Sequence, residues 1–153
     1  MNHFNNVIIG QKAFIINKDN KILILKRQKV DINKGLWDVP GGKAEEDENL
    51  LTSIKREIKE ETNLKLSKII LILSSSKFIG TMGVKPLIVR NIYLCKATGD
   101  IKISQEHNEY KWVRANELEK YKFAKEKDIQ NVIKKLPGII KKINLSVSYS
   151  QTN

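Results

Sequence analysis

Residues 42–64 read GKAEEDENLLTSIKREIKEETNL and place one glycine and five charged side chains at fixed intervals. These positions are Gly42, Glu48, Arg56, Glu57, Glu60 and Glu61. At ordinary residue frequencies, so many prescribed positions arise by chance at roughly one in 10^8 starting points. The stretch therefore indicates a constrained functional segment.

The same stretch predicts a helix from Asp47 to Thr62. Its apolar residues recur at helical spacing and form one stripe that a helix would bury: Leu50, Leu51, Ile54 and Ile58. Asp47 is the candidate N-cap, because acidic groups suit the positive end of the helix dipole. Asn63 is the candidate end, because helices often finish in a left-handed Gly or Asn.

Three carboxylates of this helix have different orientations at about 100° per residue. Relative to Ile54, Glu61 falls roughly 20° away inside the apolar stripe, Glu57 about 60° away and Glu60 about 120° away. An inward carboxylate is costly unless it is paired, protonated or metal-bound. Crowded like charges and an all-oxygen ligand set favour Mg2+ or Mn2+ over Zn2+ or copper.

The alternative is a solvated acidic face, or ion pairs of the glutamates with Lys55, Arg56 and Lys59. The register of Gly42 and Glu48 with the helix argues against it. The whole pattern resembles the Nudix box, G-x5-E-x7-R-E-U-x-E-E-x-G-U with U aliphatic. Every position matches except the last glycine, where Asn63 stands. This departure is conservative if Asn63 ends the helix.

The resemblance implies an α/β fold, the Nudix α/β/α sandwich with a mixed β-sheet between helices, as a single domain over residues 1–143. It also implies Mg2+ as cofactor, with Mn2+ able to substitute. The ligands would be the carbonyl of Gly41 and the carboxylates of Glu57, Glu60 and Glu61. Glu48 and Arg56 would form an orienting ion pair.

The residues before the helix, WDVPGG at 37–42, read as a short strand that ends in a Pro-Gly-Gly turn. Glycines let the backbone approach a ligand closely, so backbone oxygens can join a metal shell. Lys43 has two interpretations, a phosphate contact or a solvated surface lysine.

Hydrolysis of a diphosphate linkage requires neutralised phosphoryl oxygens and an activated water. Glu57 is the first choice for general base by resemblance. Some family members take the base from a later loop, where Glu106 and Glu109 are the candidates, and Glu106 is also a candidate late metal ligand. Either glutamate could equally be a surface residue. His107 lies between these two glutamates. A lone histidine is more often structural or exposed than part of a site.

Substrate marks lie beyond the box. The proline typical of the ADP-ribose group is replaced by Gly80, and the tyrosine typical of the dinucleoside polyphosphate group by Thr81 and Met82. This favours hydrolysis of a nucleoside triphosphate, including an oxidised one, to the monophosphate and pyrophosphate. ADP-ribose and dinucleoside polyphosphates remain alternative substrates.

Residues outside the box supply candidates for nucleotide binding. Arg27 matches a base-contacting arginine of nucleotide-sanitising members, although a surface arginine at the end of a strand is the plainer interpretation. Phe78 could stack a base, as could Trp37 and Phe123, but aromatic residues beside strands are more often core.

Two rival classes use a similar fold. Isopentenyl diphosphate isomerase calls for a site cysteine and metal-binding histidines, which this chain lacks in suitable places. A non-catalytic Nudix-like module that binds nucleotide or RNA is expected to lose box carboxylates, and all three stand here. The enzyme is therefore favoured.

The remaining segments predict one compact domain. Residues 7–17 and 21–26 read as a hairpin, and further strands are expected at 69–74, 85–97 and 110–113. A second helical region is expected at 116–136, broken near 121–124 and stopped by Pro137-Gly138. Residues 144–153 read as a flexible polar tail.

Composition limits the partners. A net charge of +11 attracts anions, but no aromatic-interleaved basic motif is seen, so nucleic acid is not the expected partner. No signal peptide or long apolar run is present, which predicts a cytoplasmic protein that does not bind membranes. The single cysteine, Cys95, reads as a core thiol. By resemblance, a homodimer is a further expectation.

Overall fold

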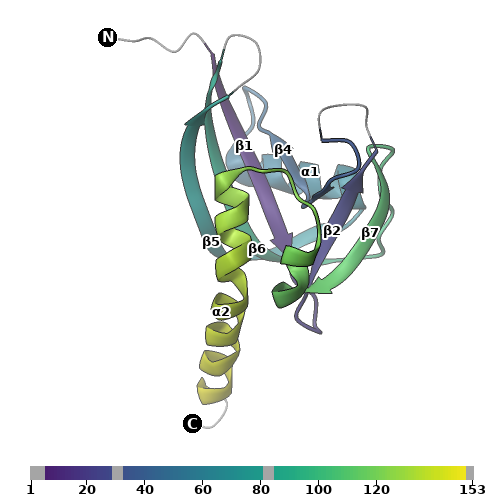
Figure 1. Cartoon of the computed structure of the whole chain (residues 1–153), viewed down its shortest axis with the longest axis vertical. Coiled ribbons are helices and arrows are strands. Elements are labelled where there is room, and N and C mark those ends of the chain that lie inside the picture. The colour runs from purple at the N-terminus through teal and green to yellow at the C-terminus, as the bar shows by residue number, and fades with distance from the viewer. Residues whose placement is uncertain (1–5, 29–32, 81–84, 151–153) are drawn as a thin grey trace.

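The computed structural model describes residues 6–28, 33–80 and 85–150. Within these residues, seven strands and three helices are arranged as shown in Figure 1. In chain order they are β1 (Val7–Ile15), β2 (Lys21–Arg27), β3 (Trp37–Asp38), β4 (Gly41–Lys43), α1 (Leu50–Thr62), β5 (Lys65–Ile79), β6 (Leu87–Thr98), β7 (His107–Arg114), the 3-10 helix η1 (Ala115–Lys120) and α2 (Lys127–Ser150). None of the described helices is long and apolar enough to cross a membrane.

The strands form two sheets. The larger has the order β4-β1-β6-β5 and the smaller the order β3-β2-β7. β1 runs parallel to β6, from Val7 opposite Leu87 to Ile15 opposite Cys95, whereas the other paired strands are antiparallel. The mixed sheet expected from the sequence is therefore confirmed.

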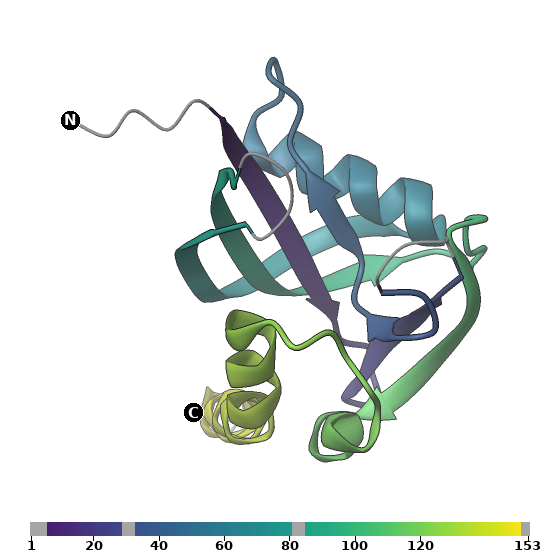
Figure 2. The ribbon, with the colours of Figure 1, turned by 45° about the horizontal axis from the view of Figure 1, so that its top comes forward.

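The two longer helices, α1 and α2, cover opposite faces of the larger sheet, and β1 runs between them in Figure 2. Side chains alternate along β1, so Phe14 joins the core beside α2 while Ala13 and Ile15 join the core beside α1. β6 alternates in the same way. Cys95 is fully buried in the core beside α1, as predicted.

Helix α1 is close to its predicted form, with one error at its start. Its N-cap is Asn49, whose side chain accepts a hydrogen bond from the Thr52 N–H at 2.8 Å, so the prediction of Asp47 was wrong. The predicted end is confirmed, because Asn63 has the left-handed conformation, with φ 63°.

The predicted hairpin of residues 7–17 and 21–26 was wrong. β1 and β2 belong to different sheets and meet only at an isolated bridge between Ile16 and Ile22. The turn itself forms, because the Asn17 side chain accepts hydrogen bonds from the N–H groups of Asp19 and Lys21. Before this turn, β1 pairs in parallel with β6 instead.

The second helical region is broken as predicted, between η1 and α2, but its predicted stop was wrong. α2 continues through Pro137 to Ser150. Leu136 and Ile140 are buried on either side of the proline, so tertiary packing outweighs the missing hydrogen bond. Residues 144–150, expected as a flexible tail, are helical, and the mobility of residues 144–153 stays a prediction.

Candidate functional site

The predicted Pro-Gly-Gly turn is a bend at Pro40, and both glycines belong to β4. This segment, Pro40 to Gly42, is called the glycine turn below, and it lies against the end of α1. The Gly41 N–H donates to Glu61 Oε2 at 3.3 Å, and Gly41 has φ 149°. A side chain at Gly41 would come within 2.8 Å of Lys12 Cα, so only glycine fits between β1 and the turn. Glu61 is 9% exposed, and burial raises its pKa to about 8. The turn therefore meets a buried carboxylate, as the helical projection indicated.

Glu57 lies one helical turn before Glu61 and faces the same glycine turn. A Cβ on Gly42 would be 2.5 Å from the Glu57 carboxyl carbon, so the glycine makes room for this carboxylate. Burial raises the pKa of Glu57, and the charges of Glu60 and Glu106 raise it further. Two neighbouring carboxylates thus disfavour full ionisation in the absence of a cation.

Arg56 holds Glu48, which precedes α1, and two carboxylates of the helix itself. Its Nε and Nη2 bind the two oxygens of Glu48 at 2.6 and 2.9 Å, a bidentate pair. Its Nη1 reaches Glu57 at 3.1 Å and Glu60 at 3.2 Å, and its Nη2 also donates to the carbonyl of Lys43 at 3.1 Å. The bond to Arg56 lowers the pKa of Glu48 to about 2. The expected pairing of Arg56 with Glu48 is therefore present.

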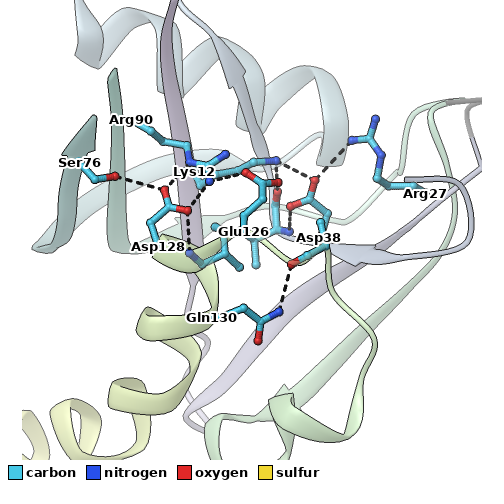
Figure 3. Close-up of polar contacts among 11 residues, drawn as sticks. Lys12, Arg27, Asp38, Ser76, Arg90, Glu126, Asp128 and Gln130 are labelled. Carbon is cyan, nitrogen blue, oxygen red and sulfur yellow. Dashed lines mark hydrogen bonds and ion pairs between the residues drawn. The ribbon is translucent and has the colours of Figure 1, made fainter. Parts of the chain in front are cut away.

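A second charged group lies beside the turn, outside the box (Figure 3). Lys12 Nζ is 2.7 Å from Asp38 Oδ2, and Arg27 Nη1 is 3.4 Å from the same oxygen. Burial alone would raise the pKa of Asp38, but Lys12 and Arg27 outweigh it and lower the pKa. Lys12 was not singled out from the sequence. The signal was a lysine inside an otherwise apolar strand, VIIGQKAFI.

A third charged group joins the larger sheet to the start of α2 (Figure 3). Arg90 Nε binds Asp128 Oδ2 at 2.7 Å, and Arg90 also pairs with Glu126. The guanidinium lies 5.0 Å from the centre of the Phe78 ring. Phe78 therefore packs against a buried arginine, and sequence reasoning missed the arginine and both acids.

The two later candidates for the general base, Glu106 and Glu109, have different surroundings in the structure. Glu106 lies in the turn before β7 and is close enough to Glu57 to raise its pKa. Glu109 instead pairs with Lys26 at 3.6 Å and Lys111 at 3.3 Å. Glu106 therefore lies near the box glutamates, whereas Glu109 forms ion pairs with two lysines of the strands.

His107 is 4% exposed, and burial lowers its pKa. Its Nδ1 is buried without a hydrogen-bond partner among the described residues. Asp38 and Glu106 both act on its pKa, so the imidazole lies near the site.

The other predicted binding residues differ in burial. Lys43 is exposed at the end of β4. Trp37 is 8% exposed and packs edge-on against Tyr121, with ring centres 5.3 Å apart, and Phe123 is also buried. The core interpretation of these two aromatics, Trp37 and Phe123, therefore holds.

The donor set suits a hard divalent cation, although the side chains are held by other partners. Among the described residues, no three His, Cys, Asp or Glu side chains are grouped to hold a metal as they stand, and Arg56 engages Glu57 and Glu60. The ligands expected from the box are all oxygens, and a cation would offset the burial and the like-charge repulsion that raise the pKa of Glu57 and Glu61. The residues present fit such an ion.

Comparisons with known proteins found a family model and several relatives that match most of the chain. The family model described as NUDIX domain matches residues 9–136. An 8-oxo-dGTP diphosphatase of Buchnera aphidicola is 34% identical over 120 residues, which cover 78% of this chain and 85% of that protein. An ADP-ribose pyrophosphatase of Methanocaldococcus jannaschii is 31% identical over 123 residues, covering 78% and 70%.

Solved structures show the same architecture. The MutT protein of Methanosarcina mazei has a TM-score of 0.69 and 26% identity, covering 88% of this chain and 95% of that one. The residues that the family model matches, 9–136, include nearly all of both sheets, α1 and the glycine turn. The chain belongs to the NUDIX domain family.

Proposed function

We propose that this protein is a divalent-metal-dependent pyrophosphohydrolase that converts a nucleoside triphosphate to its monophosphate and pyrophosphate. The observation that carries the proposal is the pair of carboxylates beside the glycine turn, the buried Glu61 and the partly buried Glu57. Relatives named as diphosphatases and pyrophosphatases support the same reaction type. Nudix hydrolases generally depend on a divalent metal, and Mg2+ is the ion proposed here, with Mn2+ as a substitute.

The proposed ligands are the Gly41 carbonyl, Glu57, Glu60 and Glu61. When bound, the ion supplies charge neutralisation for the phosphates and lowers the pKa of water. Glu60 is 59% exposed at its side chain, so it would complete the ligand set from the rim. Arg56 and Glu48 are positioning residues, because their ion pair fixes the helix face that carries these carboxylates.

In the reaction, water attacks a phosphorus atom and a new P–O bond forms as the anhydride P–O bond breaks. The water's proton passes to a carboxylate, and pyrophosphate leaves. Glu57 is the proposed base, because its raised pKa suits a proton acceptor near neutral pH. Glu106 is the alternative base, since its charge acts on Glu57 from the turn before β7.

For the substrate, we propose that Arg27 contacts the base and Lys43 a phosphate. Arg27 is held beside Asp38 near the turn, which supports the first assignment. Phe78 is a candidate to line the nucleoside site, although its ring already packs against Arg90. A relative named ADP-ribose pyrophosphatase makes ADP-ribose the second candidate substrate.

The test is hydrolysis of a nucleotide panel with Mg2+ by wild type, Glu57→Gln and Glu61→Gln. The panel contains canonical and 8-oxo nucleoside triphosphates, ADP-ribose, dinucleoside tetraphosphate and NADH. Release of pyrophosphate from triphosphates, lost in both variants, is the expected result. Glu46→Gln is the matched control, because Glu46 is exposed in the loop before α1.

A wild type that hydrolyses none of these compounds would favour the non-catalytic binding module instead. Unchanged rates in both carboxylate variants would remove the catalytic role of the box.

The proposed enzyme acts on small nucleotides in the cytoplasm rather than on nucleic acid. Gel filtration of the same preparation tests the expected homodimer.

A further inference from the structure

Lys12 is a partly buried cation in the middle of β1. Its side chain is 13% exposed and contacts two successive residues of the segment that leads into the glycine turn. Nζ lies 2.7 Å from Asp38 Oδ2 and 3.5 Å from the Val39 carbonyl oxygen. A single side chain from β1 thus holds both a side chain and the backbone of this segment.

The backbone of the same position supports the turn. Lys12 lies opposite Gly41 in the β1–β4 register, and the neighbouring Ala13 N–H donates to the Pro40 carbonyl at 2.8 Å. Gly41 in turn donates its N–H to Glu61. Only one residue therefore separates Lys12 from the buried carboxylate.

Lys12 also acts on this carboxylate electrostatically. Burial is the largest influence on Glu61 and raises its pKa, while the positive charge of Lys12 opposes that effect. Asp38, Lys12 and Arg27 together carry one net positive charge. Asp38 and Glu57 also raise the pKa of Glu61, so Lys12 is the cation of this group that opposes their effect.

We propose that Lys12 is a positioning residue of the carboxylate site, clamping the turn at Gly41 against Glu61 through its ion pair with Asp38. Arg56 holds Glu48, Glu57 and Glu60 from within the box, and Lys12 supplies the matching clamp from outside it. The inference rests on the proposed function and adds a residue that residues 42–64 do not contain.

Lys12→Met is the first test. Loss of a positive charge near the site should make Mg2+ bind the substrate-free protein about threefold or more tightly, measured by calorimetry at about pH 8.5. Loss of the clamp should lower kcat about tenfold while KM changes by less than about twofold. A variant with a merely damaged fold would lose both Mg2+ binding and kcat.

A conservative variant and a double-mutant cycle complete the test. Lys12→Arg keeps the charge and should retain kcat within about threefold of wild type. If Lys12 acts through Asp38, the double variant Lys12→Met/Asp38→Asn should lose no more kcat than Asp38→Asn alone. Lys26→Met is the matched control, because Lys26 pairs with Glu109 on the neighbouring strand.

The outcomes are distinguishable. Additive losses in the cycle, or a raised KM with unchanged kcat, would overturn the clamp, the latter by making Lys12 a substrate contact. Equal Mg2+ affinity and kcat in Lys12→Met and wild type would also overturn it. If wild type hydrolyses no nucleotide, the proposed function fails, whereas Mg2+ affinity still tests whether Lys12 acts on the carboxylate site. No Mg2+ binding to wild type would overturn both.

Discussion

Gly42 leaves the space that the Glu57 carboxylate fills, because a Cβ at Gly42 would lie 2.5 Å from the Glu57 carboxyl carbon. Gly42→Ala should therefore displace Glu57 and lower kcat at least about tenfold. Overpacking should also lower the free energy of unfolding by about 1–3 kcal/mol. Initial rates and urea unfolding measure the two effects.

The matched control for Gly42→Ala is Gly138→Ala. Gly138 lies inside α2, and a Cβ there meets nothing within 4 Å. This substitution should stabilise the protein by about 0.5–1 kcal/mol, because alanine is the better helix former. Equal rates in Gly42→Ala and Gly138→Ala would show that Glu57 does not need its present place.

Arg56→Lys should lower kcat about tenfold or more, although it conserves the charge. Lysine cannot bind Glu48 with two parallel N–H groups while also reaching Glu57 and Glu60, as Arg56 does. Steady-state kinetics test this, with Lys55→Met as the control because Lys55 is exposed on the same helix. Full activity of Arg56→Lys would reduce Arg56 to a simple counter-charge.

Without metal, the protein should become less stable as the pH rises from about 4.5 to about 8. Glu61 has a pKa of about 8 in the folded chain against 4.5 as the ordinary value. Over that interval the folded state keeps a proton that the unfolded state has released. Each pH unit therefore lowers the free energy of unfolding by up to about 1.4 kcal/mol. Urea midpoints in EDTA should fall with pH in wild type and fall less in Glu61→Gln. Parallel curves would contradict the raised pKa.

Binding of Mg2+ at pH 7 should release close to one proton. A pKa of about 8 means that Glu61 is mostly protonated before the ion binds, and a carboxylate ligand must lose its proton. Calorimetry in two buffers of different ionisation enthalpy gives the number released. Glu61→Gln should release fewer protons, and identical values would exclude Glu61 as a ligand.

The helix of the box was predictable because its determinants are local. Apolar spacing and the left-handed Asn63 indicated its face and its end, and the same spacing placed Glu61 inside. The start was less certain, since Asp47 and Asn49 are both good N-caps and only contacts decide between them. Local signals therefore gave the element and missed its first residue.

The pairing of β1 was not predictable from local signals. The turn at Asn17 favours a hairpin and does form, yet β1 pairs in parallel with β6, far along the chain. Such pairings depend on which faces the helices cover. The clamp of Lys12 and Asp38 depends on the same long-range arrangement, so residues 42–64 alone could not reveal it.

Arg90→Met should destabilise the protein by about 3–5 kcal/mol, because it leaves the buried Asp128 carboxylate without a cation. The Arg90 and Asp128 side chains are each 9% exposed, and Glu126 shares the same guanidinium. Asp128→Asn should cost less than Arg90→Met, because Arg90 keeps its pairing with Glu126.

Urea unfolding at pH 7 measures this order, and Lys120→Met is the control. Lys120 and Glu117 form a pair of 3.9 Å whose side chains are 74% and 42% exposed, so its loss should cost less than about 0.5 kcal/mol. Burial alone would raise the pKa of Asp128, but Arg90 lowers it, so the pair's contribution should disappear as the pH falls below about 4. If Arg90→Met were no worse than Lys120→Met, the start of α2 would be held by its apolar face alone.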